Sequence, residues 1–301
     1  MRISESCVKC LYEGQCSRTD NEEYLSEVRD LLENRKEEDT SPYMIYQFNK
    51  TYERYFGAVP SYKDERRLFN DLVLDMENEL KKEIERSDDP LATALLMSRI
   101  GNYIDYGALT EVNEKDFLEL FGDIRMRDSE KDVYESFLKS CAKAESFLLI
   151  ADNCGEIVLD KLMLCVLHER FPKLKLSVMV RGGEVLNDVT AEDALYVGLD
   201  DIAEIISNGE PIAGTIYNML PDEARNAFDN ADVVLAKGQG NYESLIGIDK
   251  PIYYMFLCKC DLFTQRFNVP KLTGMFVYST GPIACGYDIL SSDEEKHRRT
   301  T

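Results

Sequence analysis

Hydrophobic positions in the first 140 residues recur at helical spacing. Residues 20–36 begin with an acidic turn, and the apolar stripe that follows consists of Leu25, Val28, Leu31 and Leu32. Residues 61–85 repeat the pattern, with Ser61 as the expected N-cap and an expected stripe of Leu68, Leu72 and Leu80. A third helix is expected to begin near Asp89-Pro90. This part of the chain therefore predicts a helical domain.

Beyond residue 140 the pattern changes to strand, turn and helix. Short apolar runs cover residues 146–152, 174–183, 203–209 and 231–240, and PIYYMFLCK and GMFVYS supply two more. A helical segment from Gly155 to about residue 170 follows the first run. Apolar runs that alternate with helices predict an α/β fold with a mainly parallel sheet covered on both faces.

Polar residues follow these expected strands where each one ends. They are Asp152-Asn153, Arg181 to Asp188, Asn208-Gly209 and Lys237 to Asn241. Because the carboxyl ends of parallel strands share one edge of a sheet, we expect these loops to face a common crevice. This coincidence carries the functional argument.

Charge and composition narrow the choice of partners and compartment. The 301 residues hold 35 basic and 56 acidic side chains, a formal charge of −21, which disfavours nucleic acid and anionic membranes as partners. A phosphate site would need local cations to overcome that charge. With no signal peptide or membrane-spanning run, the nine cysteines are expected to be mostly reduced thiols in the cytosol. His168 is expected to serve packing or a helix C-terminus, and two histidines leave little material for His-based catalysis.

The turn ADNCGE presents hard oxygen ligands directly after a buried strand. Asp152 and Asn153 suit Mg²⁺, Mn²⁺ or a similar ion, and Asp188 can complete a site of three oxygen ligands. The alternative is that these side chains cap helices, with Asp152 or Asn153 at the first and Asp188 or Thr190 at the next. The residues alone leave both interpretations open.

The segment AKGQGNYESL combines two glycines, a lysine and a helix start after a strand. It is not a Walker A sequence, because no Lys-Ser/Thr pair follows the second glycine. Backbone N–H groups from Gly238 to Asn241 can still bind an anion at the helix N-terminus, with Lys237 as the cation.

Taken together, ADNCGE, RGGEVLNDVTAEDA, SNGEPIAGT and KGQGNYES resemble the metal-dependent damage-control phosphatase family. GNYIDYG and an N-terminal CVKC, typical of its prokaryotic-type branch, extend the resemblance over nearly the whole chain. It implies a three-layer α/β/α sandwich with a mainly parallel Rossmann-like sheet and an N-terminal all-helical domain. We place these at residues 111–290 and 1–110, with a flexible tail at 291–301.

The resemblance also implies a function. A divalent ion (Mn²⁺, Co²⁺, Ni²⁺ or Mg²⁺) would bind residues matching Asp152, Asn153 and Asp188, and the substrates would be small phosphomonoesters such as sugar phosphates or damaged phosphometabolites. The Arg-Thr-Lys motif of the eukaryotic sugar-phosphate branch is not evident, so that branch's preference does not carry over. The oligomeric state stays open.

Chemistry and resemblance together suggest roles for the remaining residues. The ion would act as a Lewis acid, with either metal-activated water or Asp152 as the nucleophile. Lys237 and the N–H groups from Gly238 to Asn241 would neutralise phosphoryl charge. Expected substrate contacts are Asn102, Asp105, Arg181, Lys237, Gly238, Asn241 and Glu243. For Asn102 and Asp105 the alternative is ordinary polarity at a helix end.

Three further interpretations stay open at this point. Cys7 and Cys10 fit a zinc site, a redox pair or simply thiols that pack as small apolar residues. A methyltransferase using S-adenosylmethionine could share the sheet, although Asp-Asn-Cys-Gly replaces the expected glycine-rich turn. A non-catalytic regulator that only binds a metabolite is the third.

Overall fold

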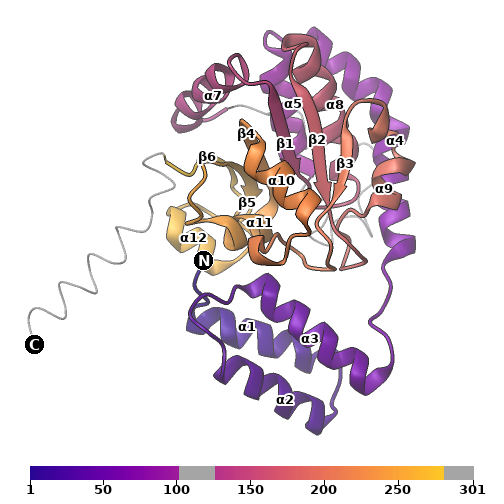
Figure 1. Cartoon of the computed structure of the whole chain (residues 1–301), viewed down its shortest axis with the longest axis vertical. Coiled ribbons are helices and arrows are strands. Elements are labelled where there is room, and N and C mark those ends of the chain that lie inside the picture. The colour runs from indigo at the N-terminus through magenta and orange to yellow at the C-terminus, as the bar shows by residue number, and fades with distance from the viewer. Residues whose placement is uncertain (102–125, 281–301) are drawn as a thin grey trace, which may run out of the picture.

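The computed structural model describes residues 1–101 and 126–280, and its described part is an α/β/α sandwich joined to a helical bundle (Figure 1). The helices before the sheet are α1 (Glu5–Cys16), α2 (Glu22–Glu33), α3 (Ser41–Phe56), α4 (Lys63–Arg86), α5 (Pro90–Ile100) and α7 (Asp128–Cys141). The helices that follow are α8 (Glu156–Arg170), α9 (Ala191–Tyr196), α10 (Asp222–Asn230), α11 (Gly238–Leu245) and α12 (Asp261–Phe267). Short 3₁₀ turns cover Leu199–Asp201 and Tyr217–Met219.

The sheet confirms the predicted α/β class. Its strands are β1 (Ser146–Ile150), β2 (Lys175–Val180), β3 (Glu204–Ser207), β4 (Val233–Lys237), β5 (Tyr253–Leu257) and β6 (Gly274–Tyr278). They lie in the order β3-β2-β1-β4-β5-β6, and only β6 runs antiparallel to its neighbour among these strands. The strand order reverses direction between β1 and β4, which is the switch point where such sheets bind ligands.

Alternation along the strands builds one apolar core on each side of the sheet. Phe147 and Leu149 of β1 pack with α4, α5, α7, α8 and α9. Leu148 and Ile150, one position on, pack with α10, α11 and α12. Since side chains of a strand point alternately to its two faces, a nearly continuous apolar strand requires helices on both faces.

The predicted helix start at Asp89-Pro90 is confirmed, whereas the predicted start of α4 is not. Asn21, Thr40 and Asp89 accept the capping hydrogen bonds of α2, α3 and α5. The prediction that Ser61 caps α4 is wrong, because α4 begins at Lys63 and the Ser61 hydroxyl donates to Glu184 Oε2.

The predicted apolar stripe of α4 is also partly wrong. The Leu68 side chain is 62% exposed, whereas the buried face of α4 consists of Arg66, Asn70, Val73, Met76, Leu80 and Ile84. Because Arg66 and Asn70 on this face are polar, the hydrophobic pattern of the sequence does not identify it as the buried face. The spacing of apolar residues therefore predicted the wrong buried face for the first turns of α4.

The predicted helical domain consists of two differently packed parts. Helices α1–α3 share a small core of their own, formed by Ile3, Tyr24, Val28, Leu32, Met44 and Phe48. Helices α4 and α5 instead pack on α8 in the core of the sandwich. The boundary at residue 110 stays a prediction, because it lies outside the described residues, as does the tail at 291–301.

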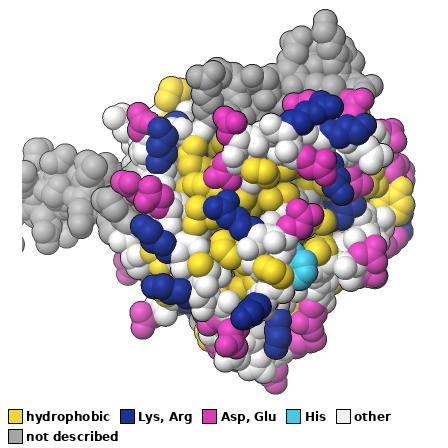
Figure 2. Space-filling view, turned by 90° about the horizontal axis from the view of Figure 1, so that it is seen from above, with side chains coloured by type: hydrophobic (Ala, Val, Ile, Leu, Met, Phe, Trp, Pro, Cys, Tyr) yellow, Lys and Arg dark blue, Asp and Glu magenta, His cyan; other side chains and the backbone are white. Residues whose placement is uncertain are grey.

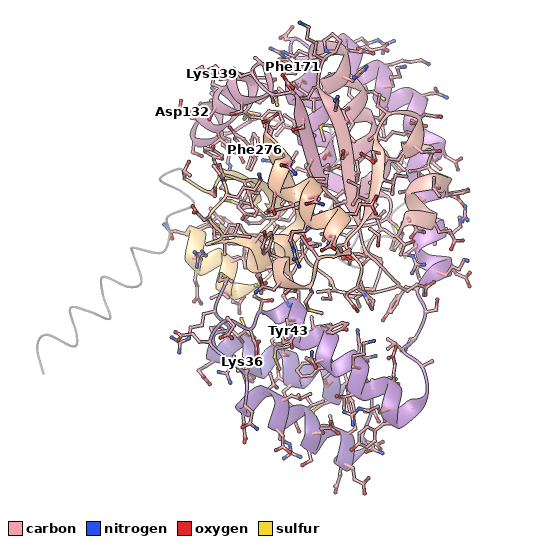
Figure 3. The ribbon with its side chains drawn as sticks, viewed as in Figure 1. Lys36, Tyr43, Asp132, Lys139, Phe171 and Phe276 are labelled. Atoms are coloured by element: carbon pink, nitrogen blue, oxygen red, sulfur yellow. The ribbon has the colours of Figure 1, made fainter. Side chains whose placement is uncertain are left out.

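The α1–α3 bundle lies beyond the carboxyl ends of the strands (Figure 1). In Figure 3, Tyr43 and Lys36 lie at that end of the molecule, whereas Phe171 lies at the opposite end of the sheet. Tyr46 of α3 donates a hydrogen bond to Glu210 Oε2 at 2.9 Å. The bundle thus contacts one of the loops that carry the expected site.

Candidate active site at the carboxyl ends of the strands

The turn after β1 holds Asp152 and Asn153 in a buried position. Asp152 is 9% exposed and Asn153 is 3% exposed. The N-cap of α8 is Gly155, with φ +78° and no side-chain cap, so the alternative in which Asp152 or Asn153 caps this helix is wrong. Neither side chain therefore caps α8.

The Asp188 loop pairs with this turn along the backbone. Asn153 and Asp188 form an antiparallel β-bridge, and the Val189 N–H donates to the Asp152 carbonyl oxygen at 2.9 Å. Thr190 caps α9 and exchanges hydrogen bonds with Asp193, so the capping alternative applies to Thr190 and not to Asp188. The structure brings the three predicted ligand residues together on two adjoining loops.

Arg181 lies between the two aspartates. Its Nη2 donates to Asp152 Oδ1 at 3.1 Å, and its Nε donates to Asp188 Oδ2 at 2.6 Å. Arg181 is only 2% exposed. Two carboxylates from loops after different strands therefore bind one guanidinium group through charge-assisted hydrogen bonds.

Asn241 joins the same network from the first turn of α11. Its Nδ2 donates to the carbonyl oxygens of Ala151 and Lys237, at 3.1 and 2.7 Å. Its Oδ1 accepts from Arg181 Nη1 at 3.1 Å and from the Thr215 hydroxyl at 2.9 Å. The fully buried Asn241 thereby connects loops after three strands. Thr215 was not among the predicted site residues.

Gly238 allows the start of α11 to approach Asp152. Its φ is +79°, and a Cβ built there would lie 2.0 Å from Asp152 Oδ2. No side chain fits this position, so the glycine of KGQG is required by contact as well as by conformation. The first N–H groups of α11, which lack partners inside the helix, begin beside the Asp152 carboxylate.

Lys237 does not occupy the position that the sequence suggested. It is fully buried, and its Nζ donates to Glu156 Oε1 at 2.6 Å and Asp160 Oδ1 at 2.7 Å. It also contacts Ser98 Oγ at 2.7 Å. The predicted direct contact with a substrate phosphate is not supported by this geometry, because neighbouring carboxylates and a hydroxyl already bind the ammonium group.

The carboxylates around Lys237 keep its side chain in the charged ammonium form. Burial disfavours its ammonium form, but the carboxylates of Asp160 and Glu156 outweigh burial and raise the pKa of Lys237. Burial raises the pKa of Asp160 as well, against the effect of Lys237. Both pKa values are raised because one ammonium group lies between two carboxylates. The cation is stabilised by two negative charges, whereas a second buried negative charge is unfavourable.

Glu156 connects this buried cluster to the predicted ligands. Its Oε2 accepts from Asn153 Nδ2 at 3.3 Å, while its Oε1 binds Lys237. Ser98, Glu156 and Asp160 were not among the predicted site residues. A signal was present, because Glu156 and Asp160 are acidic residues four positions apart that flank three apolar residues at the start of α8.

The remaining predicted contacts fall elsewhere. Glu243 faces the α1–α3 bundle, where burial raises its pKa and Ser41 and the terminal amine oppose the rise. Asn102 and Asp105 lie outside the described residues. Gly101, just before them, packs against Glu156, since a Cβ there would lie 2.8 Å from the Glu156 Cα.

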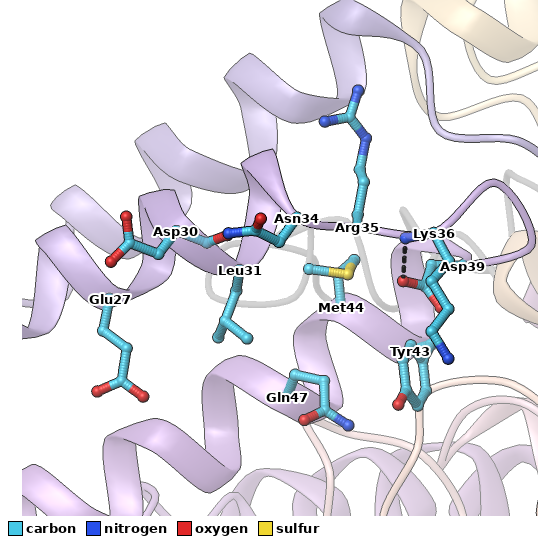
Figure 4. Close-up of a pocket in the computed structure, with 10 residues that line it drawn as sticks. All are labelled: Glu27, Asp30, Leu31, Asn34, Arg35, Lys36, Asp39, Tyr43, Met44 and Gln47. Carbon is cyan, nitrogen blue, oxygen red and sulfur yellow. Dashed lines mark hydrogen bonds between the residues drawn. The ribbon is translucent and has the colours of Figure 1, made fainter.

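One cavity lies away from these loops. A space of about 280 Å³ opens between α2 and α3, and Figure 4 shows Leu31 and Met44 among its lining residues. Lys36 N donates to Asp39 Oδ2 at its rim (Figure 4). It belongs to the helical bundle, so it is distinct from the strand-end site.

Within the part of the chain that the structure describes, no three His, Cys, Asp or Glu side chains form a metal-binding group. The predicted ligand set is different in kind, because it combines two aspartates with an asparagine. Carboxylate and amide oxygens fit a hard divalent ion. Asn153 donates its Nδ2 to Asp152 Oδ2 and Glu156 Oε2, so its Oδ1 is the end of the amide group that would face an ion.

A doubly covered, mainly parallel sheet with carboxylates at its switch point defines an α/β/α protein of the kind that binds ligands at that edge. The chain belongs to the damage-control phosphatase ARMT1-like domain family, whose model matches residues 2–273. A damage-control phosphatase of Archaeoglobus fulgidus is 31% identical over 287 residues, which cover 89% of this chain and 96% of the relative. Family membership supports a phosphatase function.

Other relatives agree with this placement. An uncharacterized protein of Methanocaldococcus jannaschii is 34% identical over 69% of this chain and 70% of its own length. A damage-control phosphatase of Pyrococcus horikoshii is 32% identical over 59% of this chain and 61% of its own. The crystal structure of a DUF89 family protein from P. horikoshii has a TM-score of 0.77, with 22% identity over 93% of this chain and 100% of that one. This last likeness shows the fold.

None of the helices in residues 1–101 and 126–280 combines the length and apolar character that a bilayer crossing requires.

Proposed function

We propose that this chain is a divalent-metal-dependent phosphatase that hydrolyses small phosphomonoesters, such as sugar phosphates or damaged phosphometabolites. The observation that carries the proposal is the convergence of Asp152 and Asp188 on the guanidinium group of Arg181. Family membership and the relatives named as damage-control phosphatases support the reaction class.

Asp152, Asn153 and Asp188 would hold the ion. When bound, Mn²⁺, Co²⁺, Ni²⁺ or Mg²⁺ supplies Lewis acidity toward a phosphoryl oxygen. The chain's own residues orient these ligands: Arg181 holds one oxygen of each aspartate, and Glu156 holds the amide of Asn153. Such hydrogen bonds to ligand residues fix their orientation and their basicity.

Local charge explains how an acidic protein can accept a phosphate. Asp152, Asp188 and Arg181 together carry a formal charge of −1, to which a divalent ion adds two positive charges. The N–H groups from Gly238 onward add the partial positive charge of a helix N-terminus beside Asp152. We propose that these N–H groups bind the substrate phosphate, with Arg181 and Asn241 holding the surrounding loops.

Lys237 takes a different role in this proposal from the one its sequence context suggested. Its ammonium group binds Glu156, whose second oxygen accepts from Asn153. Lys237 therefore acts as a positioning residue that keeps Asn153 and the start of α11 aligned.

The test uses the full chain after treatment with a chelator. Phosphate release from a panel of small phosphomonoesters is measured with each divalent ion restored in turn. We expect activity only with added ion, and we expect Asp188→Ala to reduce it at least about 100-fold because one charged ligand is lost. Asp222→Ala, an exposed aspartate at the start of α10, is the matched control and should retain parental activity.

Two results would contradict the proposal. One is phosphate release that survives chelation unchanged, and the other is parental activity in Asp188→Ala. A protein that binds metabolites without turnover, or that transfers a methyl group, would release no phosphate with any ion.

A further inference from the structure

Helix α4 carries two buried polar residues that the proposed reaction does not use. Arg66 is 1% exposed and Asn70 is fully buried, and they lie four positions apart on one face of the helix. A buried guanidinium or amide group is costly unless hydrogen bonds compensate for the lost water. The partners of these two side chains therefore show what the face is built to hold.

Asn70 holds the turn that carries Asp152 and Asn153. Its Oδ1 accepts a hydrogen bond from Gly155 N at 2.7 Å. Gly155 has φ +78° and begins α8 without a side-chain cap from its own segment. Asn70 thus binds the N–H group of the N-cap residue from another helix, 85 residues away in sequence.

Arg66 holds the neighbouring loop, which carries Asp188. Its Nη2 donates to Glu184 Oε1 and its Nε to Asp193 Oδ2, both at 3.0 Å. Glu184 precedes Asp188 in the loop, and Asp193 follows it. Asp193 Oδ2 in turn accepts from Thr190 N at 3.0 Å, so the contact continues into the cap of α9.

We infer that Arg66 and Asn70 are positioning residues that set the relative placement of Asp152 and Asn153 against Asp188, and thereby the affinity for the divalent ion. The inference rests on the proposed function only through the identity of these ligands. One rigid helical turn spans both loops, so a shift of either loop must break a hydrogen bond to α4. Residues that orient metal ligands in this way influence affinity without touching the ion.

The experiment compares metal binding and local protection in the full chain. Asn70→Leu removes the acceptor at similar size, and Arg66→Lys retains the charge but cannot bind two carboxylates in the same fork. For both variants we expect Mn²⁺ affinity, measured by calorimetry on chelated protein, to fall about 10- to 100-fold. In Asn70→Leu the Gly155 amide should also exchange with solvent faster in the metal-free protein, and Asn70→Asp, which keeps an acceptor, should restore slow exchange.

Met76→Ala is the matched control. Met76 is a buried residue of the same helix in the apolar core, so its truncation destabilises α4 without touching either loop. It should leave the Mn²⁺ dissociation constant unchanged. If Asn70→Leu and Arg66→Lys bind Mn²⁺ with parental affinity, or lose no more than Met76→Ala does, the positioning role is wrong. A parental protein that binds Mn²⁺ but releases no phosphate would contradict the phosphatase proposal alone.

Discussion

At the scale of single residues, Gly238 shows how closely this site is built. Its positive φ and the 2.0 Å approach of a built Cβ to Asp152 Oδ2 are separate constraints. The first is a backbone preference that glycine meets at small cost. The second is a contact with a predicted metal ligand, and any side chain would displace that carboxylate. The two constraints can be separated by substitution.

We predict that Gly238→Ala reduces phosphate release at least about 100-fold, because the methyl group occupies the position of the Asp152 carboxylate. Gly247→Ala is the control, since Gly247 has φ +94° but nothing within 4 Å of its built Cβ. Both variants should lose about 1–2 kcal/mol of stability from backbone strain. Activity per folded molecule is compared after thermal melts, and an equal loss in both variants would refute the contact argument.

At the scale of elements, Glu130 ties three pieces of the sandwich together. This α7 residue accepts from Arg99 Nη1 of α5 at 2.7 Å and from the Phe276 N–H of β6 at 2.9 Å. Arg127 adds a further contact at 2.9 Å. Burial alone would raise the pKa of Glu130, but the hydrogen bonds from Arg127 and the charge of Arg99 lower it below its ordinary value of 4.5.

This shift predicts an acid-sensitive contribution to stability. A carboxyl group with a lowered pKa stabilises the fold above pH 4.5, and that contribution is lost as pH falls through the folded value. Glu130→Gln should cost about 3–5 kcal/mol near neutral pH, because it leaves Arg99 without its buried partner. Urea unfolding from pH 7 down to about pH 3 should show a constant gap between parent and variant above about pH 5, and a gap that shrinks as pH falls below 4.5.

Glu135→Gln, an exposed substitution on the same helix, is the control for this measurement. Its ion pair with Lys139 is solvent-exposed, so its effect should stay below about 1 kcal/mol. A gap for Glu130→Gln that stayed constant or widened toward acid would contradict the assignment.

At the scale of the whole molecule, charge and architecture act together. The formal charge is −21, yet basic and acidic side chains are interleaved with apolar ones on the face at the amino ends of the strands (Figure 2). Any divalent ion would reduce general repulsion in such a protein. A specific site must therefore be distinguished from this bulk effect.

We predict that Mn²⁺ at 100 times its dissociation constant raises the free energy of unfolding by about 2.7 kcal/mol. The added stability should be missing in Asp188→Ala, which retains only the general charge effect, and present in Asp222→Ala. Chemical unfolding with and without the ion measures it. The same increase in Asp188→Ala would assign the effect to bulk charge and argue against a site at these aspartates.

The α/β class, the approximate strand positions and the grouping of polar loops at one edge of the sheet could all be predicted from the order of the amino acids. These follow from local periodicity, since a buried strand must be apolar and a turn needs glycine or polar residues. The helix start at Asp89-Pro90 was predictable for the same reason, because a cap is a local hydrogen bond. That Asp152, Asn153 and Asp188 lie on adjoining loops depends in addition on the pairing of β1 with β2, which the structure shows.

The partner of each polar group, by contrast, could not be predicted and depends on how distant segments pack. Lys237 looked like a phosphate-binding lysine, but Glu156 and Asp160 of another helix bind it. Leu68 looked buried, but Arg66 and Asn70 occupy the inner face of α4 because the loops that carry Asp152 and Asp188 lie against that face. Hydrogen bonds and ion pairs between segments far apart in the chain leave no periodic trace in it, so spacing alone cannot reveal them.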